Sequence, residues 1–211
     1  FADKTLCQLK FILDSNRTVE NYDKFKENLA ITDQLQAKIT DYITKLLSSG
    51  NLTEQQSEET ASLLFVTNNI QRIAERCKDI DATCSNIVAQ NNVLSPTANQ
   101  EMIKCISITQ SLLERSIEAI KTGENDIAGD IFKDKDKMRR SERKCNKAHL
   151  KRVKLGECNA SMTPHFSDIL YNLSRIADNC ISIAEEAADS VCFVELGKNA
   201  KKLGFAEGVG K

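Results

Sequence analysis

Histidine and cysteine are the residues of this 211-residue chain that could carry nucleophilic, redox or metal chemistry. There are two histidines: His149 lies in a basic stretch, and His165 lies at the start of an expected helix. The sequence places neither of them in a Ser/His/Asp or Cys/His arrangement, and no glycine-rich phosphate loop follows a strand-like segment. We therefore expect neither a hydrolase nor a transferase.

The eight cysteines favour a reducing compartment over a disulfide-bonded scaffold. Cys77, Cys84 and Cys180 fall on the apolar faces of expected helices, where a free thiol packs like a small hydrophobic side chain. No CxxC pair occurs, which argues against zinc ribbons and thioredoxin-like sites. Asn172 begins a glycosylation sequon but lies inside a strongly periodic helix, where it is a poor acceptor. These features predict a cytoplasmic protein.

Basic residues are concentrated in one segment. Between Lys133 and Lys154 there are 11 lysines or arginines and three acids, a net charge of +8 in a chain whose total is −1. One interpretation is contact with anionic lipid, worth roughly 1 kcal/mol per basic residue near the surface. Another is attraction to phosphate or nucleic acid, but no interleaved aromatics support a nucleic-acid partner. We favour a third, a solvated helix that balances acidic neighbours. The candidate lipid contacts are Lys137, Arg139, Arg140, Arg143, Lys144, Lys147, Lys151 and Arg152.

Two long helices are predicted by apolar side chains that recur every third or fourth residue. The first apolar seam is Leu63, Val66, Ile70, Ile73, Cys77, Ile80, Cys84 and Ile87, and the second is Phe166, Ile169, Leu173, Ile176, Cys180, Ile183 and Ala187. Each residue of the second seam lies 103 positions after its counterpart in the first. Segments 69–77 and 172–180 also share Asn, Arg, Ile, Ala and Cys at equivalent positions. Amphipathicity does not require the Asn and Arg matches, so the pattern indicates an internal duplication.

The composition predicts an all-α fold, because the chain has two prolines, eight glycines, no tryptophan and 5% aromatics. No apolar run approaches the roughly 20 residues of a membrane span. Gly50, Gly123 and Gly156 are expected to end helices, and Thr53, Ser95-Pro96 and Thr163-Pro164 to begin them. The expected helices cover about 2–14, 22–48, 53–90, 96–122, 125–155 and 163–190. They form two tandem three-helix bundles, in residues 1–92 and 93–190, before a loosely ordered tail in 191–211.

The repeated segment resembles a motif of the PhoU-like family, whose two three-helix bundles each contain a helix reading approximately Asn-Asp-Leu-Glu-Arg-Ile-Gly-Asp. The matching segments are 68–75 and 172–178. Residues 52–57 resemble the lead into the first motif. Residues 149–152 and 156–158 resemble the approach to the second, in the variant found at the cytoplasmic end of bacterial sodium/phosphate cotransporters. The resemblance covers about residues 20–190.

This resemblance implies a regulatory domain of a sodium-dependent phosphate transporter rather than an enzyme. The domain would lie at the cytoplasmic face of the inner membrane and contact the membrane-spanning domain or another copy of itself. A start at Phe1 fits a chain from which that membrane domain has been removed. One alternative is a free-standing regulator of an ATP-driven phosphate importer and its sensor kinase. An alternative of another class is a structural helical adaptor.

The resemblance also implies iron or zinc as candidate ligands. In the family, acids four residues apart share a helix face and can bind metal clusters, and oxygen ligands suit such cations. Here the first acid of each motif is replaced, so that the motif positions read Gln71, Arg72, Ser174 and Arg175. The remaining candidate ligands are Glu75, Asp79, Asp178 and Glu185. Because an acidic helix face is commonly only solvated, we do not expect tight metal binding.

Overall fold

The computed structural model describes residues 2, 4–5, 19–122 and 125–189. Within these ranges the chain forms long helices: α2 (Val19–Ser48), α3 (Glu54–Ala89), α4 (Pro96–Thr122), α5 (Asn125–Lys154) and α6 (Thr163–Asp189). A short 3-10 helix, η1 (Ala160–Met162), precedes α6. The all-α prediction is confirmed. Residues 2, 4 and 5 are helical, but the rest of the helix expected at 2–14, Gly123 and the predicted tail at 191–211 lie outside the described residues.

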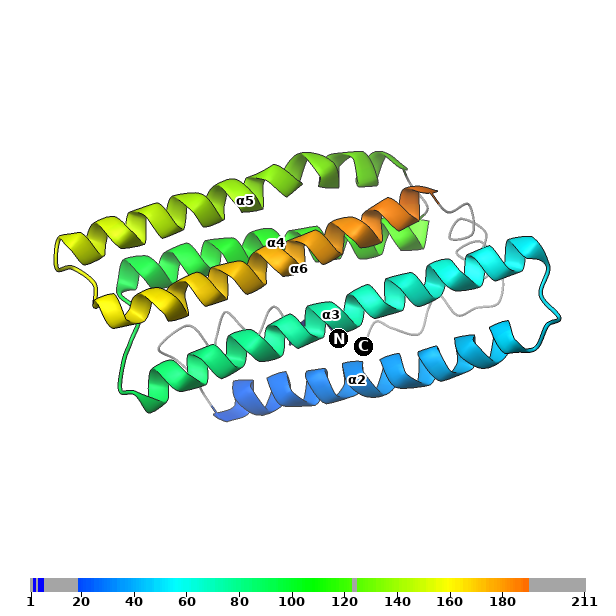
Figure 1. Cartoon of the computed structure of the whole chain (residues 1–211), viewed down its shortest axis with the longest axis horizontal. Coiled ribbons are helices and arrows are strands. Elements are labelled where there is room, and N and C mark those ends of the chain that lie inside the picture. Colours follow the sequence, from blue (N-terminus) through cyan, green and yellow to red (C-terminus); the bar gives the residue numbers. More distant parts are fainter. Residues whose placement is uncertain (1, 3, 6–18, 123–124, 190–211) are drawn as a thin grey trace.

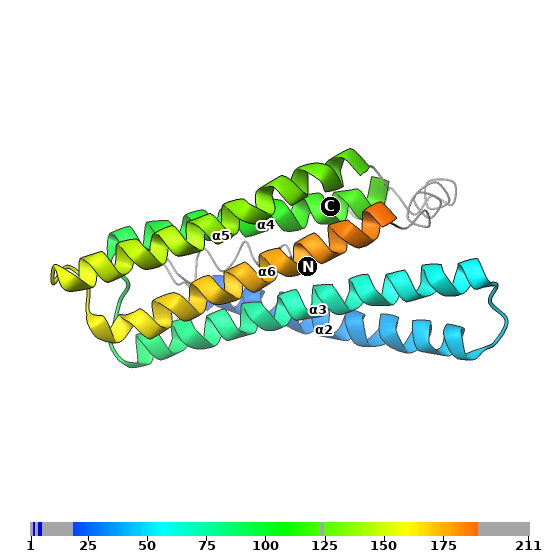
Figure 2. The same cartoon turned by 45° about the horizontal axis from the view of Figure 1, so that its top comes forward.

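The helices lie roughly along one direction, with α3 and α6 side by side in the middle of the molecule (Figures 1 and 2). These two helices run antiparallel and pack against each other. Helix α2 packs against α3, while α4 and α5 both pack against α6 and against each other. The two duplicated halves therefore meet through the helices that carry the repeated motif. The exact boundary at residues 92 and 93 stays a prediction, although the turn between α3 and α4 lies there.

The two apolar seams form the interior of the molecule, as their spacing predicted. Every residue of the second seam is buried, and so are six of the eight in the first; Leu63 and Ile70 are partly buried and pack against the same core. One continuous core contains residues of both seams. The tandem-repeat prediction is therefore confirmed in its main physical consequence: two equivalent helices bury equivalent faces.

The helix ends follow the predicted local signals. Thr53 accepts a hydrogen bond from the Gln56 amide at 3.2 Å, while the Gln56 side chain accepts one from the Thr53 amide at 2.9 Å, which completes a capping box. Ser95 caps α4 ahead of Pro96 by accepting from the Ala98 amide at 3.3 Å. Gly50 and Gly156 adopt φ values of 68° and 74° just after α2 and α5. Glycine reaches this left-handed region at no steric cost, so both chain reversals follow from the sequence.

The entry into α6 is more elaborate than expected. The helix does begin at Thr163, but η1 comes first, and the Asn159 side chain caps it by accepting from the Ser161 amide at 3.0 Å. An Asn two residues before a Ser is a local turn signal that the sequence interpretation did not use. At the end of η1, the Thr163 hydroxyl lies 3.1 Å from His149 Nε2 on α5.

The interpretation of the seam cysteines is confirmed. Cys77, Cys84 and Cys180 are buried free thiols. Burial raises the pKa of the Cys77 and Cys180 thiols well above the usual value, because the interior disfavours a thiolate. Asn172 is also buried and donates to the Asp168 carbonyl at 3.1 Å, so its side chain is not available as a glycosylation acceptor.

Candidate functional sites

In the first motif helix, the side chain at the altered motif position, Gln71, contacts a neighbouring helix. Gln71 donates from Nε2 to Asp33 Oδ1 at 3.1 Å, and Lys78 Nζ lies 2.7 Å from Asp33 Oδ2. Both contacts join α3 to α2. The Gln71 amide thus donates a hydrogen bond to the Asp33 carboxylate. An acidic side chain at position 71 would be repelled by the negative charge of Asp33. The sequence identified Gln71 as an altered motif position but could not identify its partner on α2.

The acidic candidates of α3 face solvent. Glu75 and Asp79 are both exposed, and Asp79 pairs with Arg76 at 2.9 Å, one turn away. Arg76 also donates to the Asn172 side chain at 3.4 Å, which links α3 to α6. Arg72, at the neighbouring motif position, is exposed. This face is therefore a solvated mixture of both charges.

The acidic candidates of α6 are divided between an ion-pair cluster and open solvent. Asp178 accepts from Arg139 of α5 at 3.4 Å and pairs with Arg175 at 3.2 Å, whereas Glu185 is exposed. Ser174, the altered motif position, is buried. Metal binding at Asp178 would thus have to displace two arginines.

Within the described residues, no three His, Cys, Asp or Glu side chains come together in a way that could hold a metal ion. Glu75, Asp79, Asp178 and Glu185 remain the candidate ligands for iron or zinc, and the expectation that they do not bind metal tightly stays a prediction.

The outer side of α5 carries an exposed basic row. Its members recur every three or four residues, as required for one helix face: Arg140, Lys144, Lys147, Lys151 and Lys154. No ion pair of these five was found within the described part of the chain. Leu150 and Leu155 are exposed beside the row.

The other candidate lipid contacts on α5 are engaged within the protein to different degrees. Arg143 and Lys137 are exposed, although Arg143 donates to the Arg139 carbonyl at 3.3 Å and Lys137 lies 4.0 Å from Asp134. Arg152 points inward instead. Its guanidinium contacts both carboxylate oxygens of Glu101 on α4, at 3.1 and 2.6 Å. Arg152 therefore does not belong to the basic row.

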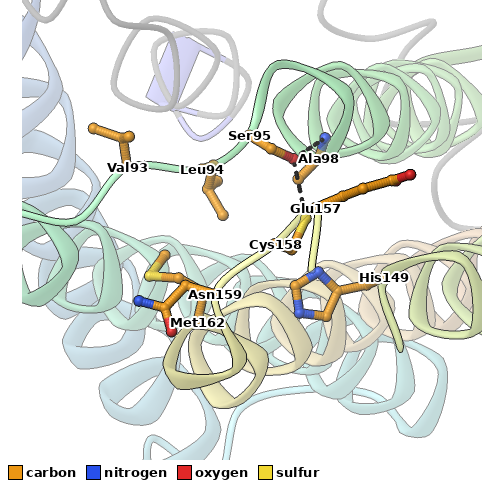
Figure 3. A pocket seen from close by; sticks show the side chains of 9 residues that line it. All are labelled: Val93, Leu94, Ser95, Ala98, His149, Glu157, Cys158, Asn159 and Met162. Carbon is orange, nitrogen blue, oxygen red and sulfur yellow. Dashed lines mark hydrogen bonds between the residues drawn. The ribbon is translucent and has the colours of Figure 1, made fainter. Parts of the chain in front are cut away.

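A small pocket lies where α4 begins and α5 turns into α6 (Figure 3). Its volume is about 220 Å³, and its lining residues are Val93, Leu94, Ser95, Ala98, His149, Glu157, Cys158, Asn159 and Met162. We call it the end pocket. His149 is 2% exposed and stacks on Phe166 with ring centres 4.4 Å apart. Its Nε2 lies 3.1 Å from the Thr163 hydroxyl, and its Nδ1 is buried without a hydrogen-bond partner among the described residues.

The surroundings of His149 favour a neutral imidazole. Burial lowers the pKa of His149 below its usual 6.5, and the positive charge of Arg152 lowers it further, while Glu101 acts in the opposite direction. A neutral imidazole has one protonated nitrogen. When Nε2 carries that proton it donates to Thr163, which leaves the Nδ1 lone pair free.

This pKa shift predicts acid sensitivity. In the unfolded chain, His149 binds a proton as the pH falls through about 6.5, whereas in the folded protein its pKa is lower. The free energy of unfolding should therefore fall as the pH drops below 6.5. The slope should approach 1.4 kcal/mol per pH unit at most, a roughly tenfold change in the folding equilibrium. Thermal unfolding between pH 7.5 and 5 measures it. His149→Phe should flatten this dependence and the control His165→Gln should not; equal slopes in all three proteins would contradict the prediction.

The sequence interpretation missed the end pocket. His149 and Cys158 lie nine positions apart, and the chain reversal at Gly156 between them brings both to the same cavity. That reversal was the available signal. The cavity wall formed by residues 93–98 had no such signal, because it comes from a turn more than 50 positions earlier in the chain.

Comparison with known proteins identifies relatives over most of the chain. The model of the PhoU domain family matches residues 9–81 and 102–187. The phosphate-specific transport system accessory protein PhoU homolog 1 of Thermotoga maritima is 21% identical over 202 residues, which cover 92% of this chain and 84% of that protein. The crystal structure of PhoU from Pseudomonas aeruginosa superposes with a TM-score of 0.77 at 15% identity, covering 88% of each chain. Each of the two family segments contains one copy of the duplicated motif.

Proposed function

Since the chain belongs to the PhoU domain family, we propose that it regulates inorganic phosphate transport by binding a transporter, not by catalysing a reaction. The observation that carries this proposal is the family match over both halves, each with its own motif helix at the centre of the fold. Family membership also argues against the structural adaptor, which would have no connection with phosphate.

The transporter that we favour is a sodium-dependent phosphate carrier, with this domain at the cytoplasmic face of the inner membrane. The support is the resemblance of residues 149–152 and 156–158 to the cotransporter variant of the family. A second candidate is a free-standing regulator of an ATP-driven importer. Two facts favour it: the name of the Thermotoga maritima relative, and the 84% of that protein's length that the match covers. Among the described helices, none combines the length and apolar composition that crossing a bilayer requires.

An exposed apolar face on the first repeat supports an interaction role. Leu35 and Ile39 on α2 are 44% and 43% exposed, and Tyr42, on the same side of that helix, is 68% exposed. A shallow cavity of about 160 Å³ lies between α2 and α3 here, lined by Ala2, Thr32, Leu35, Gln36, Ile39, Thr67 and Ile70. Large apolar side chains gathered on one face are typical of a protein-binding surface. We assign this face, the α2 apolar face, to contact with the transporter.

The functional test uses cells that lack their own copy of the gene. Phosphate uptake is measured with and without sodium, with the intact protein and with Ile39→Asp/Tyr42→Asp, which places two charges on the α2 apolar face. We expect the intact protein to alter sodium-dependent uptake and the double variant to lose that effect. Val88→Asp is a matched control, because Val88 is a 58% exposed apolar residue near the other end of α3.

Each outcome of this test separates the candidates. An effect on sodium-independent uptake alone would favour the ATP-driven importer over the carrier. No effect on any phosphate uptake would overturn the proposed function. An unchanged effect in the double variant would remove the α2 apolar face from it.

The sequence favoured a solvated helix that balances acidic neighbours, but the exposed basic row on α5 has no ion pair among the described residues, so we propose it as a membrane-contact surface for a domain beneath a bilayer. With roughly 1 kcal/mol per basic residue near an anionic surface, Lys144→Glu/Lys147→Glu/Lys151→Glu should lower the affinity for vesicles with anionic lipid by 100-fold or more. Co-sedimentation at two salt concentrations measures this, because higher salt should weaken the contact.

The control for the vesicle experiment changes net charge equally at other places. Lys38→Glu/Lys104→Glu/Lys121→Glu alters three exposed lysines on α2 and α4 and should retain most of the binding. If co-sedimentation of the unaltered protein stays flat as anionic lipid increases, the basic row is a solvated face that balances the acidic remainder of the chain.

A further inference from the structure

The end pocket brings a thiol and an unpartnered imidazole nitrogen to one small cavity. Cys158 is partly exposed, whereas the other five described cysteines are buried. Figure 3 shows the His149 ring beside Cys158, with one ring nitrogen directed toward it, and the Cys158–Ser95 hydrogen bond of 3.4 Å. The buried Nδ1 of His149 has no hydrogen-bond partner within the described residues. A buried nitrogen without a partner carries a desolvation cost that a ligand in the pocket would relieve.

The groups around the thiol suit nucleophilic chemistry. In the tautomer whose Nε2–H donates to Thr163, neutral His149 presents a lone pair at Nδ1 that can accept a proton. Arg152 is hydrogen-bonded to Glu101, which is the main reason that its pKa is raised, and Cys158 contributes to the same rise, so the guanidinium supplies positive charge near the thiol. The Ser95 hydroxyl that contacts the thiol also caps the N-terminus of the 27-residue helix α4. A cysteine beside a base, an arginine and a helix N-terminus is the setting in which thiols become reactive.

We propose that Cys158 is a thiol–disulfide exchange site for small disulfides, with His149 as the proton acceptor. The Cys158 S–H proton passes to His149 Nδ1, and the thiolate sulfur attacks one sulfur of the small disulfide. The S–S bond of that disulfide breaks, its other half leaves as a thiolate, and this thiolate takes up the proton from His149. A mixed disulfide on Cys158 and one free small thiol result, with no external oxidant.

The pocket indicates the class of adduct. About 220 Å³ is enough for a short side arm but not for a large group, and the polar groups of Ser95, Asn159 and Glu157 line the space. A short polar thiol, of the size of cysteine or cysteamine, matches this lining. The inference goes beyond the proposed function, since the pocket lies at the opposite end of the fold from the turn that joins α2 to α3 (Figure 1).

The test follows labelling by cystamine, a small disulfide, with intact-protein mass spectrometry and peptide mapping. The full chain carries Cys7→Ser and Cys192→Ser, because these two cysteines lie outside the described residues. We expect one adduct, at Cys158, formed at least tenfold faster than at the same thiol in urea-unfolded protein. His149→Gln should lower the rate about tenfold, at the lower limit for the loss of a general base.

The controls separate chemistry from misfolding. Cys158→Ser should abolish the fast adduct, and the buried Cys77 should remain unlabelled in every folded variant. Thr163→Val, which removes the partner of His149 Nε2, should slow labelling without unfolding the chain. The proposal is overturned if Cys158 reacts no faster than in urea, or if His149→Gln and Thr163→Val, both folded, keep the original rate.

Discussion

Replacing Ile176 with alanine is expected to lower the free energy of unfolding by about 2–5 kcal/mol. Ile176 is fully buried in the second apolar seam. Truncation removes buried apolar surface and leaves a cavity that the long helices around it cannot close completely. Its counterpart Ile73, 103 positions earlier, is also fully buried, so Ile73→Ala should cost a similar amount. Urea denaturation of the two variants measures both losses.

The matched control for these variants is Ile39→Ala. Ile39 is 43% exposed on α2, so the same truncation should cost below about 1 kcal/mol. If Ile73→Ala and Ile176→Ala cost no more than this control, the two apolar seams do not form the core. A large loss for one seam only would instead contradict their structural equivalence.

Arg152→Met is expected to lower the free energy of unfolding by about 2–4 kcal/mol. The side chains of Arg152 and Glu101 are only 13% and 21% exposed, and two hydrogen bonds join them. Removing the guanidinium leaves the Glu101 carboxylate in a mostly dry site without its partner, and that desolvation is the main cost. The pKa of His149 should also rise, because the repulsion from Arg152 is lost while Glu101 remains.

Denaturant unfolding and an NMR titration of His149 measure these two effects. Arg152→Met/Glu101→Met should recover most of the stability, because no charge then remains unpaired. Arg139→Met is the control: Arg139 is 47% exposed in its pair with Asp178, so its loss should cost at most about 1 kcal/mol. If Arg152→Met lowers the free energy of unfolding no more than Arg139→Met does, the Arg152–Glu101 pair is not a structural link between α4 and α5.

The parts of the fold that could be predicted are those set by local periodicity and local caps. The seams, the capping box at Thr53, the Ser95-Pro96 start and the turns at Gly50 and Gly156 each depend on residues within a few positions of one another. Apolar spacing then determines which face of a helix is buried. It does not determine which helix covers that face, so the antiparallel contact between α3 and α6 needed the structure.

The candidate sites were less predictable because they depend on partners distant in the sequence. Gln71 was recognised as an altered motif position, but Asp33, its partner, lies on another helix. Arg152 was grouped with exposed basic residues, although its seven-residue spacing from Met138 and Cys145, both buried, could have placed it on the inner side of α5. The end pocket depends on two turns that come together only in three dimensions. His149 and Cys158 lie nine positions apart, on either side of the turn at Gly156, whereas the cavity wall at residues 93–98 comes from the other turn and had no signal in the sequence.

The contact between α3 and α6 has a consequence for the history of the gene. Each apolar seam packs partly against the other copy and partly against helices of its own copy, so deleting either copy would expose apolar surface of the other to water. Each copy now depends on the other to complete its hydrophobic core. The inner faces of the two copies are apolar at every equivalent seam position, although only three of the seven pairs are identical.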